Sequence, residues 1–196
     1  MRTLVFIVFA LFAVALAAAR GEIIQPPLQQ DGAAQNGPYR PKPGESVLKV
    51  EVEGRGDVYI KLYTKEAPKT TAHIIKLVRD GFYDGQRFHR VETSPKPYIV
   101  QIGDPASKTG DLSGNGGSGG RVEYEESGFS NESGSVGLSR PKNDPSGGDS
   151  QFYILYERAS FLDGNYTVFG KVVSGMDVVR RVQRGDRVIR ITLLSG

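Results

Sequence analysis

Two alternating runs joined by a glycine turn decide the fold class: residues 48–62 read LKVEVEGRGDVYIKL. Over residues 48–53 each apolar side chain is followed by Lys or Glu, which is the period-two pattern of a strand with one buried face. Residues 58–62 repeat the alternation after the turn at 54–56. Two such runs, so close in the sequence, predict an antiparallel hairpin.

Outside this hairpin the sequence contains further strand patterns and two helical ones. The first helix is expected to begin at Ala67-Pro68, because Pro is tolerated in a first turn, and to stop before Gly81. The second is expected near residues 175–184. The remaining strands are expected at about 86–91, 97–103, 134–139, 150–156, 166–173 and 189–193. This pattern predicts a mainly β protein, a closed eight-stranded antiparallel β-barrel capped by two α-helices.

The composition excludes several classes of function. The chain has 196 residues, 25 Lys and Arg, 22 Asp and Glu, two His and no Cys. Disulfide scaffolds and cysteine nucleophiles are therefore excluded, and we expect no metal and no cofactor. The charge is too evenly mixed to predict a nucleic-acid partner. The glycine-rich segment 114–120 lacks the Lys and Ser or Thr that end a phosphate-binding loop, so we expect a mobile loop beside a binding groove.

The amino terminus predicts export. Residues 1–19 combine one Arg with a sixteen-residue apolar run ending in alanines, which predicts a cleaved signal peptide and no stable membrane insertion afterwards. Residues 20–45 are rich in Pro, Gly and Gln, which predicts a flexible tether, and residues 46–196 form the folded domain. We expect a periplasmic or secreted protein.

Two of the predicted strands carry apolar side chains on both faces. If one set fills the barrel (Val100, Ile102, Phe152 and Ile154), the outer face presents Ile99, Gln101, Gln151 and Tyr153. Apolar surface with a few polar groups is typical of a binding site, although a helix or loop could cover this face instead.

Six motifs occur in an order that resembles the cyclophilin-type peptidyl-prolyl cis-trans isomerases, across nearly all of residues 46–196. They are Phe88-His89-Arg90-Val91, Gln101-Ile102-Gly103-Asp104-Pro105, Gly117-Ser118-Gly119-Gly120, Ser150-Gln151-Phe152-Tyr153-Ile154, Leu162-Asp163-Gly164 and Val168-Phe169-Gly170-Lys171-Val172. The resemblance implies an eight-stranded barrel with two helices. It also implies an enzyme that rotates X-Pro peptide bonds, binds proline-containing peptides and unfolded or folding proteins, and is monomeric.

The same resemblance implies the site residues. Arg90 takes the place of the catalytic arginine that stabilises the twisted amide, and Gln101 would steer the substrate carbonyl. The implied substrate-binding residues are Tyr98, Ile99, Ser139, Arg140, Gln151, Tyr153, Phe161, Leu162 and Tyr166. Tyr98 and Tyr153 replace the usual Phe, Tyr166 replaces a His, and Phe161 replaces a Trp. The last change makes tight binding of the inhibitor cyclosporin doubtful.

Two other functions stay open. A proline-peptide binding module with little turnover would use the same fold. A serine hydrolase would use His89, Asp104 and a serine, but the sequence lacks a nucleophile-elbow context, and we expect His89 to be a hydrogen-bonded core residue. The glycosylation sequon at Asn165-Tyr166-Thr167 lies inside the expected site, which favours a bacterial source.

Overall fold

The computed structural model describes residues 37–94 and 98–196. The predicted signal peptide and residues 20–36 of the predicted tether lie outside the described residues. The strands are β1 (Ser46–Val52), β2 (Gly56–Leu62), β3 (Arg90–Glu92), β4 (Ile99–Ile102), β5 (Ser135–Leu138), β6 (Phe152–Leu155), β7 (Val168–Ser174) and β8 (Val188–Ser195). The α-helices are α1 (Pro68–Arg79) and α2 (Met176–Arg181), and short 3-10 helices lie at Pro105–Thr109 and Ser160–Leu162.

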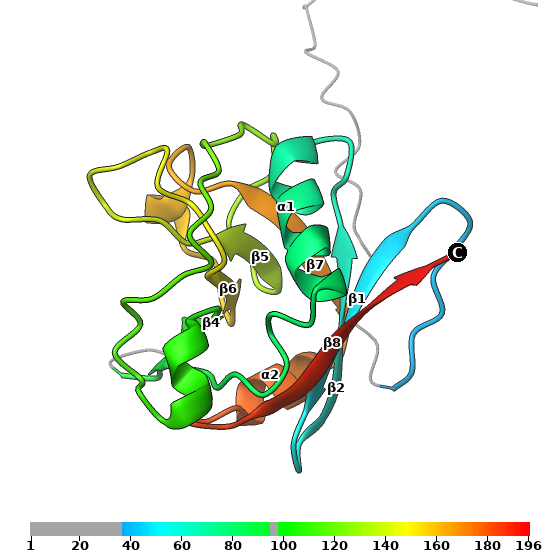
Figure 1. Ribbon diagram of the computed structural model, residues 1–196. Coiled ribbons are helices and arrows are strands. Elements are labelled where there is room, and N and C mark those ends of the chain that lie inside the picture. The colour runs from blue at the N-terminus through cyan, green and yellow to red at the C-terminus, as the bar shows by residue number, and fades with distance from the viewer. Residues whose placement is uncertain (1–36, 95–97) are drawn as a thin grey trace, which may run out of the picture. The chain divides into compact units, whose positions relative to one another are not determined.

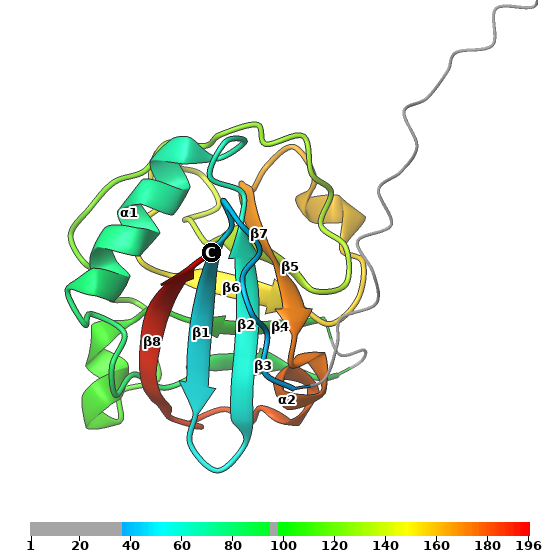
Figure 2. The same ribbon diagram turned by 90° about the vertical axis from the view of Figure 1, so that its right-hand side faces the viewer.

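All eight strands belong to one antiparallel sheet in the order β3-β4-β6-β5-β7-β2-β1-β8. The predicted hairpin is β1 and β2, with Val50 opposite Val58. The sheet curls around a core to which β1, β2, β4, β6 and β7 all contribute buried apolar side chains (Figures 1 and 2). The mainly β class and the two α-helices are thus confirmed, and Figure 2 shows the helices at opposite ends of the curled sheet.

A closed strand ladder is not what the structure contains, because β3 and β8 are the edges of the sheet. The gap between them is bridged at the beginning of β8 by the segment that precedes β3. Arg87 pairs with Arg187 in an isolated bridge, the Phe88 N–H donates to the Asp186 carbonyl at 3.0 Å, and the Val188 N–H donates to the Gln86 carbonyl at 2.8 Å. Turns occupy residues 80–85, so only this short segment can pair. Within the described residues no regular strand ladder joins β3 to β8, and the barrel is therefore open.

Both predicted helices are present, with one difference in length. In α1, Pro68 stands in the first turn, and Ile74, Leu77 and Val78 are buried. The second helix ends at Arg181, three residues earlier than predicted, because Val182 adopts extended geometry with ψ 134. The chain beyond it then pairs with the segment before β3, which a longer helix would prevent.

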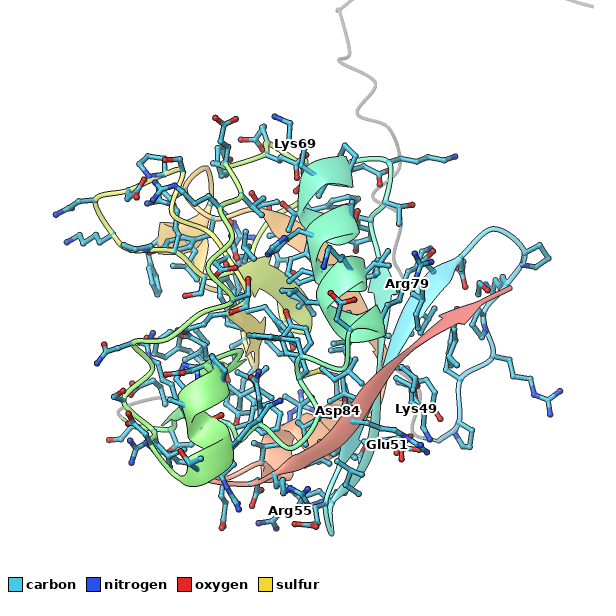
Figure 3. The ribbon with its side chains drawn as sticks, in the orientation of Figure 1. Lys49, Glu51, Arg55, Lys69, Arg79 and Asp84 are labelled. Carbon is cyan, nitrogen blue, oxygen red and sulfur yellow. The ribbon has the colours of Figure 1, made fainter. Side chains whose placement is uncertain are left out.

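The outer face of the hairpin is polar, as the alternation requires. Figure 3 shows Lys49 and Glu51 on this face, and Lys49 also forms an ion pair with Asp57 at 3.1 Å. Residues 37–45 contact the domain: the Gly44 N–H donates to the Gly196 carbonyl at 3.3 Å. Neither helix of the described residues is long and apolar enough to cross a membrane.

Candidate functional site

The outer faces of β4 and β6 carry a second apolar cluster, separate from the core. Val100 and Ile102 point into the core with Phe152 and Ile154, as their alternation predicts. On the other face lie the buried residues Ile99, Tyr153, Leu155 and Ala159, packed against Tyr98, Leu162 and Tyr166. The 3-10 helix at Ser160–Leu162 and the loop after it flank this face and leave a pocket open beside it.

This pocket, called the proline-site pocket below, has a volume of about 220 Å³. The structure brings ten of the eleven predicted site residues together on its walls: Arg90, Tyr98, Ile99, Gln101, Ser139, Arg140, Tyr153, Phe161, Leu162 and Tyr166. The eleventh, Gln151, lines a neighbouring pocket. Phe161 lies at the rim with 69% of its surface exposed, whereas Ile99 and Tyr153 are buried, with 3% and 2% of their surfaces exposed. The pocket therefore has an apolar floor and a charged edge at Arg90.

Arg90 is held from three sides in the edge strand β3. Its Nη2 donates to the Tyr98 hydroxyl at 2.6 Å, its Nη1 to Gln101 Oε1 at 3.4 Å, and its Nε to Glu92 Oε1 at 3.1 Å. Each Nη carries two hydrogens, so each keeps one N–H for a further acceptor. The guanidinium is thus oriented at the pocket while retaining donors for a ligand. The Tyr98 hydroxyl, a departure from the usual Phe, is one of its anchors.

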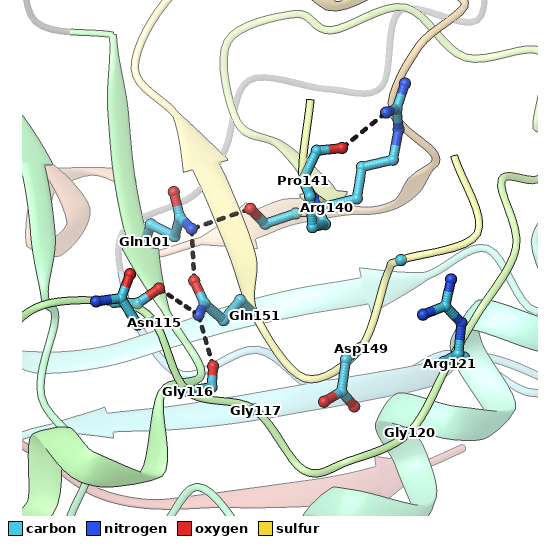
Figure 4. A pocket seen from close by; sticks show the side chains of 13 residues that line it. Gln101, Asn115, Gly116, Gly117, Gly120, Arg121, Arg140, Pro141, Asp149 and Gln151 are labelled. Atoms are coloured by element: carbon cyan, nitrogen blue, oxygen red, sulfur yellow. Dashed lines mark hydrogen bonds between the residues drawn. The ribbon is translucent and has the colours of Figure 1, made fainter. Parts of the chain in front are cut away.

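The two glutamines form a chain of hydrogen bonds between the pocket and the glycine-rich loop (Figure 4). Gln101 Nε2 donates to Gln151 Oε1 at 2.8 Å and to Ser139 Oγ at 3.0 Å. Gln151 Nε2 donates to the carbonyls of Gly114 and Gly116 at 2.8 and 2.7 Å. Both amide groups are fully used as donors. Gln101 can donate to a substrate carbonyl only if its bond to Ser139 or Gln151 opens.

A buried polar chain supports the pocket floor from behind. The Tyr153 hydroxyl donates to Asn131 Oδ1 at 2.7 Å, and Asn131 is fully buried. Asn131 in turn donates to Asp163 Oδ1 from its backbone N–H at 2.7 Å and from Nδ2 at 3.0 Å. These two bonds hold the pKa of Asp163 below its ordinary value, while burial raises the pKa of Tyr153. The extra hydroxyl of Tyr153 therefore points away from the pocket and fixes its ring.

Arg140 separates the proline-site pocket from a second pocket of about 430 Å³, which Arg121, Asp149 and Gln151 also line (Figure 4). Its guanidinium lies 4.9 Å from the centre of the Tyr166 ring and donates to the carbonyl of Asn165 at 2.8 Å. These contacts fix Arg140 over the wall that the two pockets share.

His89 is buried, as predicted, with 5% of its surface exposed. It is not fully hydrogen-bonded, because its Nδ1 has no partner among the described residues. Burial lowers its pKa. Asp104 is occupied elsewhere, because its carboxylate accepts from the N–H groups of Ala106 and Gly116 at 2.9 and 3.1 Å. Within residues 37–94 and 98–196 no hydrogen bond joins His89 to a serine, so the geometry does not favour a serine hydrolase.

Sequence reasoning missed several supporting residues. Glu92 follows Arg90 by two positions, so strand alternation could have placed it beside the guanidinium. Asp163 belongs to one of the six motifs. No local pattern indicates that Asn131 is its partner, because 32 positions separate the two residues. Gly137 was also missed: a Cβ there would stand 2.2 Å from the Tyr153 ring.

Comparisons with known proteins agree on one family. A family model described as "Cyclophilin type peptidyl-prolyl cis-trans isomerase/CLD" matches residues 47–192. A "Probable peptidyl-prolyl cis-trans isomerase" of Brucella suis is 38% identical over 156 residues, covering 70% of this chain and 78% of the relative. "Peptidyl-prolyl cis-trans isomerase B" of Bacillus subtilis is 35% identical over 137 residues, covering 69% and 89%. A Cryptosporidium parvum cyclophilin-type isomerase has the same fold, with a TM-score of 0.67 at 22% identity over 78% of this chain and 99% of its own. A structure of it in the presence of the dipeptide Ala-Pro scores 0.66.

Proposed function

Because the chain belongs to the cyclophilin-type peptidyl-prolyl cis-trans isomerases, we propose that it rotates X-Pro bonds by hydrogen bonding from Arg90 to the twisted amide, in the proline-site pocket. The observation that carries this proposal is the pocket itself. It joins an apolar floor to an anchored guanidinium that retains free N–H groups. The single-residue roles rest on this geometry and on the match to the family motifs.

The chemistry needs few groups. Rotation about an X-Pro bond faces a barrier of roughly 18–20 kcal/mol, because the amide loses its resonance as it twists. In the twisted state the prolyl nitrogen gains a lone pair, and a guanidinium can donate to it only then. One charge-assisted hydrogen bond is worth about 1.5–3 kcal/mol, or roughly one to two powers of ten in rate. Arg90 therefore accounts for part of the acceleration, and the pocket must supply the rest.

The pocket supplies it by holding the proline ring against Ile99, Tyr153 and Leu162 while the preceding carbonyl swings. Gln101 guides that carbonyl after exchanging its bond to Ser139 for one to the substrate. The Ala-Pro dipeptide named with the Cryptosporidium structure supports proline peptides as the ligand class. Unfolded or folding proteins that expose such bonds are the proposed clients.

We further propose that the protein acts after export, since residues 1–19 have the pattern of a signal peptide. Mass spectrometry of the protein recovered from the periplasm or the medium tests this. An amino terminus near residue 20 is expected, and an intact Met1 in the cell interior would contradict it.

The test of the reaction is exchange NMR on a short Ala-Pro peptide, with the protein, Arg90→Ala and Arg79→Ala. Arg79 is exposed at the end of α1 and does not line the pocket, so it controls for the loss of one arginine. Acceleration by the protein and by Arg79→Ala, with at least a tenfold loss in folded Arg90→Ala, is expected. Equal rates in the two variants would refute the role of Arg90.

The same experiment separates catalysis from mere binding. A docking module would shift the peptide resonances without exchange between its cis and trans signals. The anchored Arg90, with N–H groups left for the twisted amide at the edge of the cavity, is the feature that favours turnover over simple docking.

A further inference from the structure

The described residues contain a further concave surface with basic walls, which shares no lining residue with the proline-site pocket. It is a groove of about 530 Å³ between the end of α2, the β1–β2 turn and β3. Its walls include Arg55, Arg180, Arg181 and Arg184, with Val91 and Thr93 on the β3 side, and no acidic side chain lines it. Figure 3 shows Arg55 at this end of the sheet, and Figure 1 shows α2 beside it. We call it the arginine groove.

Two of the four arginines are neutralised by neighbouring carboxylates. Arg55 makes two bonds to Asp186, at 2.9 and 3.2 Å. Arg181 bonds Asp177 at 2.9 Å. These pairs fix the groove walls, but they leave little charge for a ligand.

The other two arginines keep their full charge. In the described part of the chain, Arg184 donates only to backbone carbonyls, those of His89 and Leu112, at 2.8 and 2.9 Å. Arg180 is exposed and makes no hydrogen bond or ion pair with the described residues. Two uncompensated guanidinium groups therefore meet in one groove, and a guanidinium fork fits a carboxylate in bidentate geometry.

A purely structural explanation covers only part of this arrangement. Arginines in the last turn of a helix interact favourably with its dipole, which explains Arg180 and Arg181. Arg184 lies beyond the helix and Arg55 lies in the β1–β2 turn, so the dipole does not account for them. Side chains from three separate segments converge on the same groove.

We propose that the arginine groove docks an acidic segment of a partner protein, an extended run of Asp or Glu side chains. A nucleic acid is disfavoured, because it needs a longer basic track, whereas the outer face of the neighbouring hairpin pairs Lys49 with Glu51 and Asp57. One consequence rests on the proposed function. Since β3 presents Arg90 to the proline-site pocket and Val91 to the groove, a client could occupy both.

The test is an NMR titration of the protein with a hexaglutamate peptide at low ionic strength. Shifts centred on the amides of Thr93 and Gln183, which line the groove, are expected. Arg180→Glu is expected to weaken binding at least fivefold, because it reverses the unpaired charge. Lys65→Gln, an exposed site beyond the end of β2 opposite the groove, is expected to leave binding unchanged. Unchanged isomerisation of a neutral Ala-Pro peptide by Arg180→Glu confirms that the variant is folded.

Several outcomes overturn the proposal. They are the absence of shifts at the groove, equal weakening by both variants, or tighter binding of a short oligothymidine than of hexaglutamate. For a peptide that carries both an Ala-Pro bond and a glutamate tail, we expect a lower KM than for the tail-free peptide, and loss of that gain in Arg180→Glu. Failure of the proposed function would instead abolish turnover of the neutral peptide and leave hexaglutamate binding intact.

Discussion

Replacing Tyr153 by Phe tests whether the pocket floor is held from behind. The change removes one hydroxyl and leaves the ring that lines the pocket. Tyr153 is 2% exposed and its partner Asn131 is fully buried. The change would therefore remove the only side-chain donor to Asn131 Oδ1 among residues 37–94 and 98–196, in a site closed to solvent. An unsatisfied buried acceptor costs about 1–3 kcal/mol. For a chain of this size a loss of about 2 kcal/mol lowers Tm by roughly 4–8 °C.

The assay combines thermal unfolding, urea titration and exchange NMR with an Ala-Pro peptide. Tyr124→Phe is the matched control, because the Tyr124 hydroxyl donates to Glu126 at 2.5 Å on the exposed surface, where such a change costs at most about 0.5 kcal/mol. We expect Tyr153→Phe to lose stability while kcat/KM changes less than threefold. If Tyr153→Phe unfolds like Tyr124→Phe, the bond to Asn131 does not stabilise the pocket floor and the reasoning fails. If Tyr153→Phe loses tenfold in kcat/KM at unchanged Tm, the hydroxyl acts in the pocket, which also refutes the reasoning.

Three further changes test other parts of the site. Gly137→Ala places a Cβ 2.2 Å from the Tyr153 ring, so we expect a stability loss of about 1–3 kcal/mol with a fall in kcat/KM; urea unfolding and exchange NMR measure both, and wild-type kinetics would contradict the contact. Folding lowers the pKa of Asp163 from 3.8, so its ionised form stabilises the fold above pH 3.8, and that contribution is lost as the pH falls through the lowered pKa. The difference in unfolding free energy between the protein and Asp163→Asn should therefore shrink in acid. A difference that stays constant with pH would refute the linkage. Phe161→Trp enlarges the exposed rim of the pocket, and calorimetry should find tighter cyclosporin binding than in the parent; equal affinity would show that Phe161 does not limit it.

The strand faces were predictable because alternation needs only local information. Val100, Ile102, Phe152 and Ile154 lie in the core, and Ile99 and Tyr153 lie in the outer cluster, as the period of two requires. The fate of that outer face was not predictable, since both a covering segment and an open pocket fit the pattern. In the structure a 3-10 helix flanks it and leaves the pocket open.

Two sequence predictions were wrong in detail, and both concern the same junction. The ladder between β3 and β8 is replaced by a short pairing of residues 85–88 with residues 185–188, and the helix before that pairing ends at Arg181 rather than at residue 184. That pairing joins segments about 100 positions apart, and local propensity cannot predict contacts between such segments. His89 was placed correctly in the interior, but its orphaned Nδ1 depends on which side chains surround it there.

The sequence alone predicted most of the strands and their buried faces, because these follow from nearest-neighbour periodicity. The roles of Arg90, Gln101 and Gln151 were implied by the order of six motifs that resemble one family, not by periodicity. Only the tertiary structure decided how those groups are held. The bond from Tyr153 to Asn131 spans 22 positions, and the bond from Gln151 to Gly116 spans 35. Arg55 and Arg180, which line the same groove, are 125 positions apart. Contacts at such separations are fixed by how the strands pack, and no local pattern encodes them.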